Sequence, residues 1–195
     1  MSDGHGGTLV MGLGNPIMGD DGLGIVALEE LRRCWRISPG IRLEDGGTWG
    51  MSLLPLIEET DRLLVIDAIK AGGSPGTLVC LEGDDLPRYF ALKLSPHQID
   101  LKEVLAVCHL RGSTPREVVA LGLEPDSIDM STELSVPVAE ALPHLLQEIV
   151  NRLGDWGLSC VPVPGPTSTS TTGPVAGAGA GAATRTGTGA RVTRA

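Results

Sequence analysis

Carboxylates and one imidazole stand at the ends of several predicted elements in this chain. They are Asp20 and Asp21, then Asp45, then Asp67, and finally His97 before a predicted helix. Two carboxylates with one imidazole suit a borderline divalent ion such as nickel, zinc or cobalt better than magnesium or calcium, which prefer oxygen alone. Three protein ligands would leave coordination positions open for a substrate. These residue types therefore favour a metal site that a substrate can reach.

The same side chains also have structural explanations, which the sequence leaves open. An aspartate before a helix is an ordinary N-cap, and we expect Asp20 to cap the helix that follows it. Asp67 could instead bond the turn after its strand, and His97 could be a surface residue. His109 and His144 lie on predicted helices, where we expect them to face solvent or to pack.

The glycine-rich turn at 12–22 resembles a phosphate-binding loop only in part. A turn of this kind between a strand and a helix often cradles a phosphate. Here the glycines follow the pattern G-x-G-x-x-x-x-G, so the third glycine comes too late for a dinucleotide-binding turn, and the Lys of a Walker loop is missing. Two aspartates would also repel a pyrophosphate. The turn therefore indicates a cation rather than a nucleotide.

Strand and helix signals alternate along the chain. Short apolar runs predict strands over 8–13, 41–44, 63–67, 77–81 and 118–123, and apolar residues at helical spacing predict helices over 22–35, 51–59, 98–110 and 136–153. This alternation predicts an α/β fold, a three-layer sandwich with a mostly parallel five-stranded sheet flanked by helices. Because ligands bind at the carboxyl ends of the strands in such sheets, the candidate side chains would gather on one edge.

The composition changes abruptly near the C-terminus. Residues 161–195 are mostly Pro, Gly, Ala, Ser and Thr, with no Leu, Ile, Met or aromatic residue. Such a segment cannot bury enough apolar surface to offset the entropy lost on ordering. We therefore expect a single α/β domain over residues 1–155 and a low-complexity, disordered tail over 156–195.

Charge and cysteine usage restrict the partners and the compartment. The formal net charge is −9 at pH 7, and all 24 acidic residues precede position 161. Nucleic-acid binding depends on Lys and Arg, so this balance argues against it and favours a basic or metal-bearing protein partner. The four cysteines form no C-x-x-C pair, so we expect buried thiols in a reducing compartment. With no signal-peptide core and no membrane-spanning run, we expect a cytoplasmic protein.

Four motifs in this order resemble those of the hydrogenase maturation endopeptidases. They are GLGNP with GDDG (12–16 and 19–22), DGGT (45–48), IDA (66–68) and SPHQ (95–98), within a similarity over residues 8–153. The resemblance implies that Asp21, Asp67 and His97 contact the metal and act in catalysis. Many relatives have Glu where this chain has Asp21, so the shorter side chain would sit closer to the ion. The resemblance further implies a role in substrate positioning or base catalysis for Asp45, and substrate contacts from other residues of the motifs, namely Asn15, Gly46, Gly47 and Thr48.

The enzymes of this family remove a C-terminal extension from the large subunit of nickel-iron hydrogenases once nickel has been inserted. The resemblance implies that this protein acts as a monomer and recognises nickel that the precursor already holds, without keeping a metal of its own. A metal on the substrate would polarise the scissile carbonyl or generate hydroxide from water. Two alternatives stay open: a peptidyl-tRNA hydrolase-like enzyme, whose family shares the GLGNP opening, and a nickel-sensing hydrogenase assembly chaperone that does not cleave.

Overall fold

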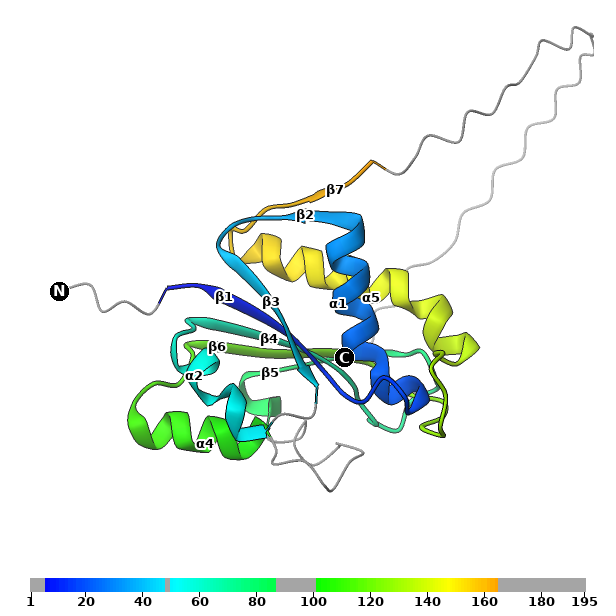
Figure 1. Ribbon diagram of the computed structural model, residues 1–195, viewed down its shortest axis with the longest axis horizontal. Helices are drawn as coiled ribbons and strands as arrows, with labels where there is room; N and C mark the ends of the chain where they lie inside the picture. Colours follow the sequence, from blue (N-terminus) through cyan, green and yellow to red (C-terminus); the bar gives the residue numbers. More distant parts are fainter. Residues whose placement is uncertain (1–5, 48–49, 87–100, 165–195) are drawn as a thin grey trace, which may run out of the picture. The chain divides into compact units, whose positions relative to one another are not determined.

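A five-stranded sheet forms the centre of the domain. The computed structural model describes residues 6–47, 50–86 and 101–164, and its strand order is β3-β1-β4-β6-β5 (Figure 1). The strands are β1 (Thr8–Leu13), β3 (Ile41–Gly47), β4 (Arg62–Ala68), β5 (Leu78–Glu82) and β6 (Glu117–Leu123). Every neighbouring pair is parallel except β5 with β6. The predicted fold class, a mostly parallel five-stranded sheet flanked by helices, is confirmed.

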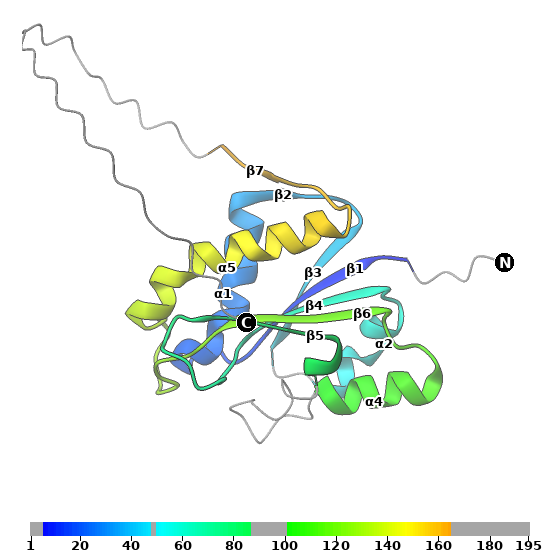
Figure 2. The ribbon, with the colours of Figure 1, turned by 180° about the vertical axis from the view of Figure 1, so that it is seen from behind.

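Helices cover both faces of this sheet. The elements are α1 (Leu23–Cys34) and α5 (Val136–Asp155) on one face, and α2 (Leu54–Glu58) and α4 (Leu101–Arg111) on the other (Figures 1 and 2). Short 3-10 turns precede or follow some of them, namely η1 (Gly19–Gly22), η2 (Gly50–Leu53) and η3 (Gly83–Asp85). The predicted helix over 98–110 corresponds to α4, and its first three residues lie outside the described part of the chain. No described helix is long and apolar enough to cross a membrane.

The central strands are apolar because both of their faces are covered. All six residues of β1 are buried, and they alternate between the two cores. Val10 packs in the core under α1 and α5, whereas Leu9 and Met11 pack in the core on the other face. Since alternate residues of a strand point to opposite faces, a continuous apolar run is what a doubly covered strand requires.

A second, two-stranded sheet was not among the predicted strands. Strand β2 (Trp35–Ile37) pairs in antiparallel fashion with β7 (Cys160–Pro162). The predicted helix over 22–35 therefore ends one residue early, because Trp35 already has extended backbone. Pairing through Pro162 also places folded chain beyond residue 155, where the tail was predicted to begin. Residues 165–195 of that tail lie outside the described residues.

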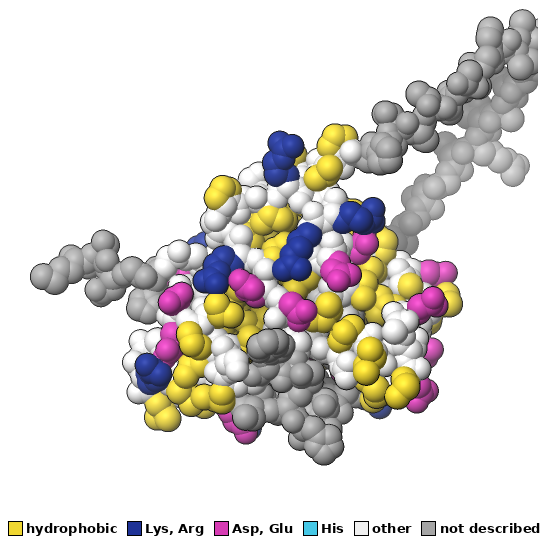
Figure 3. Space-filling view, in the orientation of Figure 1, with side chains coloured by type: hydrophobic (Ala, Val, Ile, Leu, Met, Phe, Trp, Pro, Cys, Tyr) yellow, Lys and Arg dark blue, Asp and Glu magenta, His cyan; other side chains and the backbone are white. Residues whose placement is uncertain are grey.

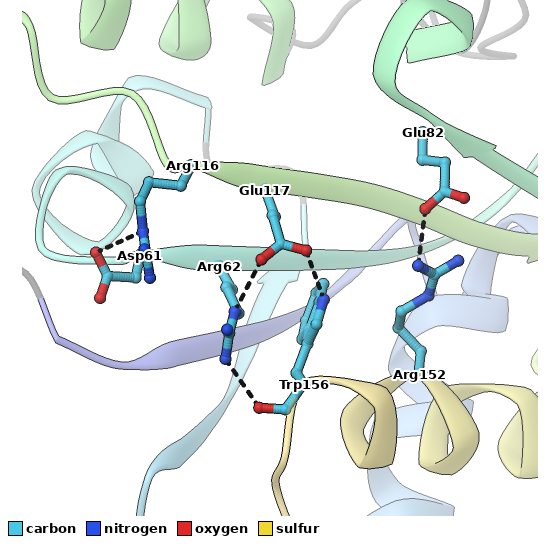
Figure 4. Close-up of polar contacts among 7 residues, drawn as sticks. All are labelled: Asp61, Arg62, Glu82, Arg116, Glu117, Arg152 and Trp156. Carbon is cyan, nitrogen blue, oxygen red and sulfur yellow. Dashed lines mark hydrogen bonds and ion pairs between the residues drawn. The ribbon is translucent and has the colours of Figure 1, made fainter.

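Polar groups join the amino ends of β4 and β6 to the end of α5 (Figure 4). Arg62 Nε donates to Glu117 Oε1 at 3.0 Å, and Trp156 Nε1 donates to Glu117 Oε2 at 2.9 Å. Arg62 also donates to the Trp156 carbonyl oxygen at 2.9 Å, with its guanidinium 5.8 Å from the Trp156 ring centroid. This cluster lies at the end of the sheet opposite the candidate site and fixes α5 to the strands.

Candidate active site at the carboxyl ends of the strands

The turn after β1 folds back onto η1. Gly14 has φ +115°, and a Cβ atom there would stand 1.7 Å from the Asp21 carbonyl oxygen, so only glycine fits. The Asn15 backbone N–H donates to Asp21 Oδ2 at 2.9 Å, and the Asn15 side-chain oxygen accepts from the Ile17 N–H at 3.2 Å. The turn thus holds the half-buried Asp21 carboxylate in one orientation at the end of β1.

Helix α1 begins directly against the ends of β1 and β4. A Cβ atom on Gly24 would lie 2.4 Å from the carbonyl oxygens of both Leu13 and Ile66, so the helix backbone touches both strands. Asp21 precedes Gly24 by about one helical turn, and Asp67 follows Ile66 directly. Since η1 also contacts β4, the two candidate carboxylates occur at the same edge of the sheet, as the sequence predicted.

The strand order reverses between β1 and β4. After β1 the chain forms β3 on one side of β1 and then crosses to form β4 on the other side of β1. In open α/β sheets such a reversal opens a crevice at the carboxyl ends of the two strands, and ligands bind there. The carboxyl ends of β1 and β4, where Asp21 and Asp67 lie, are therefore the expected ligand site.

Asp67 is fixed by the strand that bears it. Its side chain is 5% exposed, and Oδ1 accepts the backbone N–H of Ala68 at 2.9 Å. This local bond is the structural role that the sequence left open for Asp67. It does not conflict with a ligand role, because a carboxylate offers about four lone-pair sites.

The second motif lies beside the first. Asp45 is exposed and stands opposite Gly12 in the pairing of β3 with β1, and the register shifts by one residue before Gly47. The Gly47 carbonyl oxygen accepts the Gly14 N–H at 3.2 Å, so this motif packs directly on the Asp21 turn. Asp45, Gly46 and Gly47 therefore flank the same edge of the sheet.

Two predicted site residues, Thr48 and His97, lie outside the described residues. Within residues 6–47, 50–86 and 101–164, no group of three or more His, Cys, Asp or Glu side chains is arranged to hold a metal ion. Asp21 and Asp67 are thus the described members of the predicted ligand set, and the role of His97 stays a prediction.

The prediction that Asp20 caps the following helix is wrong, because no side chain caps η1 or α1. Asp20 is 0% exposed and turns the other way, toward the segment before α5. Its Oδ2 accepts from the backbone N–H groups of Asp126 and Ser127 at 2.8 and 3.1 Å and from the Ser135 hydroxyl at 2.8 Å. Its Oδ1 accepts the Ser135 N–H at 2.7 Å. Asp20 thus ties this segment to the turn that holds Asp21.

Sequence analysis missed a third buried carboxylate, Glu124, in addition to Asp20 and Asp67. It is 4% exposed and follows β6. Its side chain accepts the backbone N–H groups of Ala71, Gly72 and Gly73 at 2.7, 3.2 and 3.1 Å. These bonds fix the loop that follows β4, and with it the surroundings of Asp67. A lone Glu after an apolar strand gives no sequence signal for such long-range contacts.

The cysteines are free thiols in different environments. Cys108 is buried and Cys34 and Cys160 are half-buried, but Cys80 is exposed, so the prediction of four buried thiols is wrong there. Strand β5 is at the edge of the sheet and alternates buried with exposed residues, and Cys80 is on its exposed face. Burial raises the pKa of the Cys108 and Cys160 thiols, and partial desolvation by the surrounding residues raises that of Cys80 although the residue is exposed. A raised pKa disfavours the thiolate, which is the nucleophilic form.

Carboxylates at the reversal point of a mostly parallel sheet are typical of a ligand site in an open α/β fold. The model of a family described as hydrogenase maturation protease matches residues 25–152. The hydrogenase expression/formation protein HupD of Rhizobium leguminosarum bv. viciae is 35% identical over 153 residues, covering 77% of this chain and 76% of HupD. The chain belongs to the hydrogenase maturation protease family, and it is a maturation endopeptidase of that class.

Two further comparisons agree with this membership. The hydrogenase 2 maturation protease of Escherichia coli (strain K12) is 30% identical over 155 residues, which is 79% of this chain and 94% of that protein. The solved structure of the hydrogenase maturating endopeptidase HybD from E. coli superposes with a TM-score of 0.76 at 30% identity, covering 80% of this chain and 97% of HybD. The resemblance found in the four motifs is therefore confirmed over most of the chain.

Proposed function

We propose that this protein removes the C-terminal extension of the large-subunit precursor of a nickel-iron hydrogenase after nickel has been inserted, and that it recognises the bound nickel. The most direct structural support is the placement of Asp21 and Asp67 at the ends of two adjacent parallel strands, beside the point where the strand order reverses. Membership in the maturation protease family supplies the reaction class.

In this proposal the nickel belongs to the substrate. Asp21 and Asp67, with His97, would complete the coordination of an ion that arrives with the precursor. A divalent ion can polarise the scissile carbonyl or lower the pKa of a bound water. The bonds from the Asn15 N–H and the Ala68 N–H orient the two carboxylates before the substrate arrives, which reduces the ordering cost of binding.

The neighbouring motif would hold the polypeptide. Asp45 is exposed at the same edge and would position the substrate or accept a proton. Asn15, Gly46, Gly47 and Thr48 would offer hydrogen-bond donors to the precursor chain. Desolvation raises the pKa of the thiols of Cys80, Cys108 and Cys160, which supports hydrolysis without a cysteine nucleophile.

Family membership decides against the peptidyl-tRNA hydrolase alternative. It also favours cleavage over the chaperone alternative, and a cleavage assay separates those two. The purified protein is incubated with the nickel-loaded precursor and with the nickel-free precursor, and loss of the C-terminal peptide is followed by mass spectrometry. We expect cleavage of the loaded form alone. Equal cleavage of both forms would contradict nickel recognition, and cleavage of neither would contradict the proposed reaction.

Matched variants test the site itself. We expect Asp67→Asn and Asp21→Asn each to reduce the cleavage rate by at least about a hundredfold, since each removes a charged ligand oriented for the ion. Asp155→Asn is the control, because Asp155 is exposed at the end of α5 that lies by the amino ends of the strands, away from the candidate site. Normal rates in both site variants would remove the strand-end carboxylates from the mechanism.

A further inference from the structure

Two loops at the edge of the site pair with each other and form a ridge, defined here as residues 15–19 and 126–133. Met18 and Ser131 form a parallel bridge. The Gly19 N–H donates to the Ser131 carbonyl oxygen at 2.8 Å, and the Ser131 N–H donates to the Ile17 carbonyl oxygen at 3.1 Å. The ridge therefore joins the loop after β1 to the segment between β6 and α5.

The ridge exposes large apolar side chains. Met130 is 83% exposed, Ile17 is 53% exposed and Ile128 is 38% exposed. Figure 3 shows apolar side chains beside carboxylates over the part of this face where η1 and the segment before α5 lie in Figure 1. Apolar side chains that stand together at the edge of a binding site mark a surface that contacts another molecule. Methionine suits such a contact because it is long and adaptable.

Hydrogen bonds to the buried Asp20 carboxylate hold the ridge in place. The four bonds that Asp20 accepts from Asp126, Ser127 and Ser135 hold the segment that contains the 126–133 loop. Asp20 directly follows the 15–19 loop in the chain and precedes Asp21. A protein that docks on the ridge would thus be held in register with the Asp21 carboxylate. Such a rigid contact surface lowers the entropy cost of association.

The charges around the apolar residues limit the partner. Asp126, Asp129 and Glu133 are all exposed, and the whole chain has a formal net charge of −9. Complementary charges speed association and like charges oppose it. A segment that presents apolar side chains together with Lys or Arg would fit this surface, whereas an acidic segment would be repelled.

We propose that the ridge is a docking surface for an apolar, basic segment of the precursor protein, separate from the residues that meet the nickel. This inference rests on the proposed function, because it takes the precursor as the partner. It assigns substrate affinity to the ridge and the chemical step to the strand-end carboxylates. The ridge then binds the precursor whether or not nickel is present.

The test measures binding without cleavage. The dissociation constant for the nickel-free precursor is measured by calorimetry for the wild type, for Met130→Glu and for Ile17→Glu. We expect each variant to bind about tenfold more weakly or worse, as exposed apolar anchors at interfaces do when they are replaced by a repelling charge. The matched control is Leu110→Glu, because Leu110 is 85% exposed on α4, away from the ridge. We expect this variant to bind the precursor as the wild type does.

A second measurement tests the charge. Raising the salt from about 50 to about 500 mM should weaken wild-type binding severalfold, and less so for Glu133→Gln, because exposed charge pairs are screened. Wild-type affinity in Met130→Glu and Ile17→Glu would overturn the inference, and so would an equal loss in Leu110→Glu or no binding by the wild type. Circular dichroism confirms that each variant is folded, and Met130→Ser repeats the test without a new charge. Failure of the wild type to cleave the nickel-loaded precursor would instead contradict the proposed function.

Discussion

The buried carboxylate of Asp20 allows a quantitative prediction. It has no exposed surface and accepts hydrogen bonds from three backbone N–H groups and one hydroxyl, at 2.7 to 3.1 Å. The substitution Asp20→Asn keeps the shape but replaces one oxygen with an NH₂ group, which cannot accept. Whichever way the amide turns, at least one backbone N–H then faces another donor.

The expected cost follows from these bonds. Hydrogen bonds to charged groups are worth about 1.5 to 3 kcal/mol each, against about 0.5 to 1.5 kcal/mol for neutral ones. Asp20→Asn removes one charged bond and reduces the others to neutral strength. Relief from burying a charge offsets part of this loss. We expect the free energy of unfolding to fall by about 3 kcal/mol, which corresponds to a Tm lower by about 6 to 12 °C for a domain of this size.

Urea unfolding followed by far-UV circular dichroism measures this difference, with the slope against urea as a check that the unfolded state is unchanged. The control is Asp129→Asn in the same segment, where the carboxylate is exposed and accepts the Ser127 hydroxyl. We expect that variant to stay within about 0.5 kcal/mol of the wild type. A loss below about 1 kcal/mol in Asp20→Asn, with an unchanged slope, would refute the role given to these bonds.

Two further predictions concern packing and pH. Gly24→Ala would place a Cβ atom 2.4 Å from the Ile66 carbonyl oxygen and should cost about 3 kcal/mol, whereas Gly154→Ala, with nothing within 4 Å, should be neutral or stabilising in thermal melts. Burial and, second to it, the nearby charge of Glu58 raise the pKa of the Cys108 thiol in the folded protein. As the pH rises above about 8.5, the thiol therefore ionises in the unfolded state before it does so in the folded state, and the free energy of unfolding should fall. Comparing urea unfolding at about pH 7 and about pH 9.5, Cys108→Ala should show a smaller decline than the wild type; an equal decline would contradict this assignment.

The sequence predicts those helices and strands whose apolar residues recur at a regular local spacing. Strand β1 and helix α5 follow from apolar spacing, because a doubly covered strand and an amphipathic helix each leave a periodic signal. The pairing of β2 with β7 left no such signal, since each has three residues and they meet over more than 100 positions. The partners of Asp20 are 106 to 115 residues away, so neither its burial nor its direction could be inferred from its neighbours.

The spacing of the glycines in the first motif now has a physical explanation. Gly12 lies under the start of α1, where a Cβ atom would stand 2.3 Å from the Gly24 carbonyl oxygen, and Gly14 turns the chain with φ +115°. The third glycine, Gly19, has φ +55°, and its Cβ position is 3.1 Å from the carbonyl oxygens of both Ser127 and Asp129. A phosphate loop needs its third glycine earlier, to let a helix approach its strand. Here Gly24 serves that purpose, and Gly19 instead lets the 15–19 loop approach the 126–133 loop closely. The turn that orients the Asp21 carboxylate therefore also anchors the surface on which we propose the precursor docks.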